Sequence, residues 1–297
     1  MRVKKMAIML ILSLAISVII IGCSSEKRYY NKGVKAQENK NYEEAIENFT
    51  QAGDYEDSKD RLTECTHLND VANDKVAPSI MGLEEKIDIT CGTEFNLNDY
   101  ISERIKVEDN ITKDIKEYSI SSDEVYDRGS GIINTMENGE HEVIVTAKDE
   151  AGNKGETKFI LSINPVLVTK DNPEPVIYDG EYATVKLKSF NHGEIFEYSG
   201  MIGYYAKFDV ENKCDEPITV YWSSHTSIND YQVSPSYKIS SVAAGKKGTT
   251  FTFFEDKDIP EEAGNFSQID SIVCIIKDNE DKALFRIPTT FYTDAIK

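Results

Sequence analysis

Alternation of apolar and polar positions predicts β-strands over most of the chain after residue 76. The clearest case lies within residues 139–163, where Val143, Val145 and Ala147 alternate with more polar neighbours. A turn rich in glycine follows, and a second apolar strand returns. Because successive side chains of a strand point to opposite faces, this pattern predicts a β-hairpin with one buried face. Several short strands with turn signals between them predict a β-sandwich over residues 76–164.

The same two-residue period continues through residues 165–297 and predicts a second sandwich. Its start is marked by the Asn-Pro pair at 164–165 and by a proline-containing linker at 169–175. Trp222, the single tryptophan, shares a face with Val220, so we expect it in the core; a ligand platform is the alternative. The alternating segments lie at 182–190, 204–212, 218–224, 242–254 and 272–288.

Residues 28–70 show a helical period instead. Aromatic and small residues recur three or four positions apart in two stretches, which are separated by a polar break at 39–41. This spacing predicts two helices that pack closely as a hairpin. Residues 53–65 repeat the second stretch thirteen positions later, so we expect a third helix that caps the pair. The residues that set the period are Tyr29, Gly33, Ala36, Tyr42, Ala45, Phe49 and Ala52.

This hairpin resembles a tetratricopeptide repeat, because all of these residues except Ala36 stand at the spacings of that 34-residue pattern. The chain departs from the pattern at Asp57, where the family often has proline. The resemblance implies a module for binding other proteins or for self-association. A spacer that holds the strands away from a membrane is an equal alternative.

The first 22 residues have the layout of a secretory signal peptide, with positive residues before an apolar run. Residues 20–23, Ile-Ile-Gly-Cys, resemble a bacterial lipobox. The resemblance implies cleavage before Cys23 and a lipid on its sulfur, so that residues 23–27 form the lipidated N-terminus. Because two acyl chains give stable anchoring, we expect an extracytoplasmic protein whose membrane partner is reached through Cys23.

Residues 76–164 resemble bacterial immunoglobulin-like modules. The closing hairpin of that family commonly reads G-x-Y-x-V-x-V-x-A-x-D-x-A-G-N. This chain follows the pattern over residues 139–153, with His141 in the place of the tyrosine. Some of these modules bind calcium through clustered acidic residues. Glu108, Asp109 and Asp149 could be nominated here, but Asp is also a common turn-forming residue and no EF-hand-like spacing occurs, so we expect no metal site.

Three short stretches at 208–213, 242–247 and 281–287 resemble the immunoglobulin-like domains of unknown function that end many exported lipoproteins of low-GC bacteria. That resemblance covers residues 165–297 and implies no activity. The expected fold is therefore mainly β, with two immunoglobulin-like β-sandwiches preceded by a short tetratricopeptide-like α-hairpin.

Charge and cysteine content narrow the partners and the possible metal sites. The formal net charge of −19 over 297 residues repels nucleic acid, so we expect no nucleic-acid partner. The cysteines show no CxxC spacing, which argues against a zinc ribbon. An exported protein permits disulfides, and Cys214 and Cys274 are the pair within one expected module; whether they are bridged stays open.

Motifs for catalysis are missing from the sequence. The four histidines are scattered, and neither HExxH, GxSxG nor a phosphate-binding P-loop occurs. We therefore expect no enzyme and no cofactor. The expected function is that of a non-catalytic cell-surface lipoprotein that acts as a protein-binding or scaffold module for an unidentified protein partner. The alternative is a ligand-binding lipoprotein that captures a sugar, a peptide or an ion for a transporter or an envelope enzyme.

Overall fold

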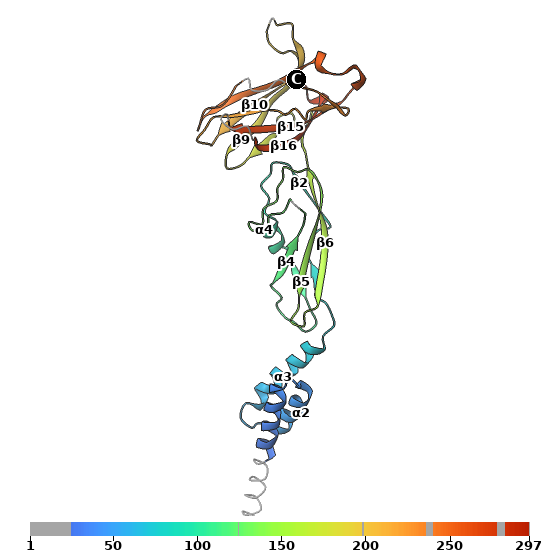
Figure 1. The fold of residues 1–297 in the computed structure, drawn as a ribbon, viewed down its shortest axis with the longest axis vertical. Coiled ribbons are helices and arrows are strands. Elements are labelled where there is room, and N and C mark those ends of the chain that lie inside the picture. The colour runs from blue at the N-terminus through green and yellow to red at the C-terminus, as the bar shows by residue number, and fades with distance from the viewer. Residues whose placement is uncertain (1–24, 124, 198, 236–239, 278–282, 297) are drawn as a thin grey trace, which may run out of the picture. The chain divides into compact units, whose positions relative to one another are not determined.

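The protein is mainly β, with a short helical part near its N-terminus (Figure 1). The computed structural model describes residues 25–123, 125–197, 199–235, 240–277 and 283–296. The expected signal peptide and Cys23 lie outside the described residues, so lipidation stays a prediction. Among the helices that the structure describes, none is long and apolar enough to cross a membrane.

The chain forms two compact units. Of the described residues, unit 1 contains 25–81 together with 106–119 and 146–156. Unit 2 contains residues 82–105, 120–145 and 157–297. The boundary passes through residues 76–164, so the segment that we expected to form one module contributes to both units.

Unit 1 begins with three helices. They span residues 25–38, Tyr42–Ala52 (α2) and Ser58–Asn73 (α3). The side chain of Asn41 accepts a hydrogen bond from a backbone N–H in the first turn of α2, which satisfies a donor that has no partner within the helix. The helix that the repeat at 53–65 predicts is present as α3, which is longer than the repeat.

These helices close around one aromatic side chain. Phe49 is 1% exposed and packs with Ala36, Ala45 and Cys65. A Cβ atom on residue 33 would lie 2.7 Å from the Phe49 ring, so Gly33 lets the first helix approach this close. The small residues that set the helical period therefore make room for the ring between the helices.

The strands that follow form two sheets. In the smaller one, β1 pairs antiparallel with β3. In the larger one the order is β2-β6-β5-β4, and β2 runs parallel to β6 (Figure 1). The elements of this part are β1 (Ser79–Met81), β2 (Lys86–Thr90), α4 (Leu97–Ser102), β3 (Lys106–Glu108), β4 (Tyr118–Ser121), β5 (Gly139–Lys148) and β6 (Lys154–Asn164).

The predicted hairpin is the neighbouring pair β5 and β6. Val143, Val145 and Ala147 are at most 1% exposed, so the predicted face is buried. The short helix α4 was not expected from the period, because its six residues offer less than two turns of pattern.

The last part of unit 2 has a four-stranded and a six-stranded sheet (Figure 1). The first has the order β14-β10-β9-β8, and the second β13-β12-β15-β16-β7 with β11 beside β15. The strands are β7 (Val166–Val168), β8 (Val176–Asp179), β9 (Ala183–Glu194), β10 (Ile202–Asn212), β11 (Ile218–Trp222), β12 (Ser227–Ile228), β13 (Tyr231–Gln232), β14 (Lys247–Glu255), β15 (Gln268–Lys277) and β16 (Ala283–Tyr292). Single turns of 3₁₀-helix cover Asp256–Asp258, Glu261–Ala263 and Thr293–Ala295.

Aromatic rings fill the space between these two sheets. Trp222 is fully buried, and its ring centroid lies 5.6 Å from that of Phe254 in one sheet and 5.2 Å from that of Phe291 in the other. Phe190 joins the same cluster, 6.2 Å from Trp222. The prediction that Trp222 is a core residue is confirmed, and the ligand-platform alternative is wrong, because no part of the ring is accessible.

The described cysteines carry free thiols. Cys274 lies in β15 and is 3% exposed, and its burial raises the pKa of the thiol to about 11. Cys214 lies in the turn after β10, where its Sγ donates to the carbonyl oxygen of Tyr182 at 3.4 Å. The pair left open by the sequence is therefore not bridged in this structure.

Candidate metal centre

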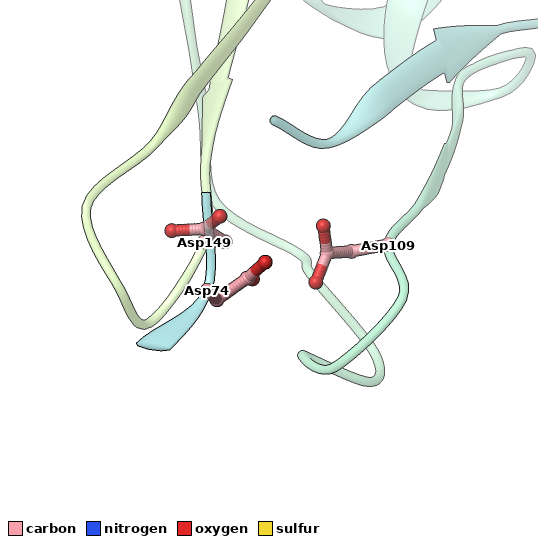
Figure 2. Close-up of side chains that lie close together, drawn as sticks. All are labelled: Asp74, Asp109 and Asp149. Carbon is pink, nitrogen blue, oxygen red and sulfur yellow. The ribbon is translucent and has the colours of Figure 1, made fainter. Parts of the chain in front are cut away.

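Unit 1 brings three aspartates together. One carboxylate oxygen of each of Asp74, Asp109 and Asp149 lies within 4.8 Å of the others, and the carboxylates face a common space (Figure 2). Two of the three residues that the sequence suggested for calcium are thus neighbours. The third, Glu108, is not part of the cluster: its side chain is half exposed and forms an ion pair with Lys106.

Asp74 is the residue that ends α3. Its backbone turns to an extended conformation there, which points the chain toward β1. Oδ1 accepts hydrogen bonds from the Val76 backbone N–H at 3.0 Å and from Nδ2 of Asn110 at 3.2 Å. The residue is 6% exposed, and its second oxygen, Oδ2, is buried with no hydrogen-bond partner among the described residues.

Asp109 follows β3 and shapes the turn after it. Its Oδ2 accepts from the backbone N–H groups of Ile111 at 3.0 Å and Thr112 at 2.8 Å. Short polar side chains often close a turn in this way. The other oxygen, Oδ1, is buried and has no partner in the described part of the chain. The turn therefore holds one oxygen and leaves the other without a hydrogen-bond partner among the described residues.

Asp149 opens the turn between β5 and β6 and is 5% exposed. Its Oδ1 accepts from the Asn153 backbone N–H at 2.7 Å, and its Oδ2 accepts from Nδ2 of Asn153 at 2.8 Å. The same amide nitrogen lies within 3.4 Å of the carbonyl oxygens of Asp74 and Val76. Asn153 thus ties this turn to the segment that leaves α3.

A second contact joins the same two elements. Nε2 of His67 on α3 lies 2.8 Å from a carboxylate oxygen of Glu150, and the Glu150 backbone N–H donates to Oγ1 of Thr112 at 3.1 Å. The three aspartates are therefore held on segments that already contact one another. A ligand in their midst needs little rearrangement of the backbone, which lowers the entropy lost on binding.

The cluster keeps Asp74 charged and leaves two carboxylate oxygens, which a cation would contact, without a partner among the described residues. The hydrogen bond from the Val76 N–H lowers the pKa of Asp74 although burial opposes this shift, and Asn110 and Lys75 act in the same direction as Val76. Asp74 therefore carries its charge at neutral pH. A buried carboxylate oxygen without a partner loses its hydration and gains nothing in return, and neighbouring carboxylates repel one another.

The donor set fits calcium. Carboxylate oxygens are hard ligands, and Ca²⁺ binds them at 2.3–2.6 Å, so oxygens on opposite sides of one ion lie about 5 Å apart. The three carboxylate oxygens lie within 4.8 Å of one another, which is close enough for one ion to contact all three. Mg²⁺ demands shorter bonds and near-ideal octahedral geometry. The cluster of described residues contains neither histidine nor cysteine, which disfavours softer transition metals.

Asp74 was missed from the sequence, because it lies between the segments 28–70 and 76–164 that we expected as modules. Its only signal is an acidic residue at the point where a helical pattern gives way to a strand pattern. Sequence spacing could not join it to Asp109 and Asp149, since the three come from a helix end, a strand end and a hairpin turn.

Comparisons with known proteins do not assign the chain to a family. No family model matches the chain, and no curated protein sequence matches it. One similar solved structure is that of fibronectin(III)-like modules of Clostridium thermocellum CbhA, with 10% identity, a TM-score of 0.20, and 72% of this chain and 93% of that chain covered. Another is SGBP-B of the Bacteroides ovatus mixed-linkage glucan utilization locus in complex with a mixed-linkage heptasaccharide, with 7% identity, a TM-score of 0.20, and 73% and 71% covered. Scores this low carry no argument about fold or function.

Proposed function

We propose that this protein is a non-catalytic, extracytoplasmic scaffold or protein-binding module, anchored by lipid on Cys23 and stabilised by one calcium ion. The ion is held by Asp74, Asp109 and Asp149. The observation that carries the calcium proposal is that Asp74 Oδ2 and Asp109 Oδ1 are buried beside a third carboxylate and have no hydrogen-bond partner among the described residues.

A calcium ion at this place joins three chain segments that are distant in sequence. It holds the end of α3, the turn after β3 and the turn between β5 and β6. Such a crosslink stiffens the passage from helices to strands within unit 1. Calcium sites of extracellular modules work at about 10⁻⁴–10⁻³ M, so three carboxylates suffice in the location that the lipobox resemblance implies. Rigid display of binding surfaces is what a scaffold requires.

The calcium proposal is tested by calcium titration of the full chain, purified in detergent, after removal of metals with EDTA. Bound calcium raises the melting temperature, and at a hundred times Kd it stabilises the native state by about 2.7 kcal/mol. Terbium luminescence, sensitised by tyrosine, reports the same site directly. We expect one ion per chain and displacement of terbium by calcium.

Matched variants separate this site from weak binding by an acidic protein. Asp74→Asn and Asp109→Asn should lose the calcium-dependent rise in melting temperature. Glu108→Gln removes a charge one residue away from Asp109 but outside the cluster, so it should keep the rise. Equal calcium responses in all of these proteins would show that the cluster is not the site.

The scaffold and anchor proposals need experiments in cells. Cys23→Ser should move the protein from the membrane fraction to the soluble fraction. Crosslinking in intact cells, followed by mass spectrometry, then compares the full chain with a version that lacks residues 29–65. Partners that vanish with the deletion assign binding to the helices, and partners that persist assign it to the strands. No specific partner in either version would contradict the scaffold proposal.

A further inference from the structure

Unit 2 contains a cleft that the proposed function does not use. Its volume is about 400 Å³. The walls come from residues 92–94, 132–136, 178–182 and 284–285. Aromatic rings from two of these segments stack against each other: the ring centroids of Tyr178 and Phe285 lie 4.3 Å apart, with 29° between their planes. Tyr182 lies 5.7 Å from Phe285 and is 39% exposed.

The cleft is preformed, because two of its walls touch. Gly92 has φ +78°, and a Cβ atom there would lie 2.7 Å from the carbonyl oxygen of Ile177 in β8 and 3.5 Å from the side chain of Ile287. Only glycine allows this approach. The turn at 92–94 therefore rests directly on the sheet, and a ligand that enters the cleft does not have to assemble it.

Tyr178 places one polar group among the rings of the cleft. Its side chain is 7% exposed, and its hydroxyl makes no hydrogen bond with a described residue but is not fully buried. Burial, followed by the charges of Tyr182, Glu94 and Glu181, raises the pKa of Tyr178 to about 12, so the hydroxyl stays neutral and available to a ligand.

The charges around the cleft have one sign. Among the described residues that line it, Glu94, Asp179 and Glu181 are acidic, and none is lysine, arginine or histidine. Asp179 is already engaged by Nζ of Lys213 at 3.2 Å and by Oγ1 of Thr184 at 2.7 Å. The two glutamates form no ion pair within the described chain, and both are exposed.

We propose that this cleft binds an organic cation. An ammonium or guanidinium group lies near Glu94 and Glu181, and its methylene stem packs on the rings of Tyr178, Tyr182 and Phe285. Aromatic faces attract cations, and they do so more strongly where water is partly excluded. The cationic group belongs either to a lysine or arginine side chain of a peptide or to a small free amine. This inference is independent of the calcium site, which lies in unit 1.

Binding of defined probes to the full chain tests the proposal. A fluorescent lysine-rich peptide measures the peptide source, and choline measures the small-amine source. The same peptide with acetylated lysines keeps the stems and loses the charges. We expect binding of the lysine peptide or of choline, weakened by added salt, and at least tenfold weaker binding of the acetylated peptide. Binding by only one of the two cations identifies the source.

Variants of exposed residues locate the binding without disturbing the core. The double variant Glu94→Gln, Glu181→Gln should bind the cation about tenfold more weakly or worse. Tyr182→Ala should lower the affinity several-fold. Glu261→Gln, an exposed change in unit 2 away from the cleft, is the matched control and should bind as the unaltered protein does. The proposal is overturned if no cation binds, if the acetylated peptide binds equally well, or if the double variant keeps its full affinity.

Discussion

Replacement of Phe49 by alanine should strongly destabilise the helices and leave the C-terminal sheets unaffected. Phe49 is 1% exposed, meets the ring of Tyr30 edge-on at 6.0 Å and lies against Gly33. The alanine that replaces it leaves a cavity which the neighbouring small residues, Ala36 and Ala45, cannot fill. Phe49 is the only aromatic residue among the buried residues of this described helical core, so its removal takes away the side chain around which the helices pack.

The expected loss of stability follows from the cost of the substitution and the stability of the helical part. A buried Phe→Ala change costs about 3–5 kcal/mol. A part of about 50 residues, at roughly 0.05–0.15 kcal/mol per residue, has a stability of about 2.5–7.5 kcal/mol. The substitution therefore removes most of the stability of the helices, and their melting temperature should fall by about 15 °C or more.

Two probes on the same sample separate the parts. Circular dichroism at 222 nm follows the helices, and fluorescence of the single tryptophan, Trp222, follows the C-terminal sandwich. Phe49→Ala should lower the first transition and leave the second unchanged, while Glu47→Ala, an exposed change on the same helix, should alter neither. An unchanged dichroism transition would refute the core assignment. A tryptophan transition that falls with it would refute the separate stability of the two parts.

Three further outcomes follow from single residues. Because hydrogen bonding lowers the folded-state pKa of Asp74, its ionised form stabilises the protein above the unfolded pKa, and this contribution is lost as the pH falls through the folded pKa. In EDTA, the difference between the urea midpoints of the unaltered protein and Asp74→Asn should therefore shrink from pH 5 to pH 3. Gly155→Ala places a Cβ atom 1.8 Å from the carbonyl oxygen of Pro78, so the free energy of unfolding, measured with urea, should fall by more than the roughly 1–3 kcal/mol that overpacking typically costs. The thiols of Cys91 and Cys274, whose pKa values burial raises to about 11, should react with Ellman's reagent only slowly until denaturant is added.

Periodicity predicted the long elements because their burial is one-sided. The hairpin strand that carries Val143, Val145 and Ala147 buries every second residue. The strand that carries Trp222 buries the predicted face as well, together with Thr219 on the opposite face. The helices of residues 25–73 likewise follow from small residues at helical spacing, since close packing needs them. In these segments local pattern and tertiary burial agree.

Elements that are held in place by tertiary contacts could not be predicted from the local pattern of apolar and polar residues. β7 lies between the Asn-Pro pair at 164–165 and the expected linker at 169–175, where no strand was predicted, but its Val166 and Val168 are buried and pair with β16. A strand of only three residues is too short to show a two-residue period in the sequence. In β14 the pattern predicts a strand but not its buried face: the structure buries Thr252 and Phe254 on one face, and on the other it buries Phe253 and leaves Phe251 half-buried.

The same limit explains what the sequence revealed of the candidate site. Asp109 and Asp149 were suggested by the family resemblance, whereas Asp74 and the unpaired oxygens depend on how α3 ends. A cluster assembled from three distant turns has no linear spacing. The cleft in unit 2 is equally invisible in the sequence, since stacking of Tyr178 on Phe285 joins residues more than a hundred positions apart.

Parallel pairing at the edges of the sheets has a mechanical consequence. β7, the first strand of the C-terminal part, runs parallel to β16, the last one, and β2 runs parallel to β6 in the preceding sheet. When a chain is pulled from both ends, strands paired in this way must slide along each other. All of their hydrogen bonds are then loaded at once, whereas a hairpin pulled from its open end breaks them one after another. A protein tethered at one end and gripped by a partner at the other would therefore resist tension through these two short ladders.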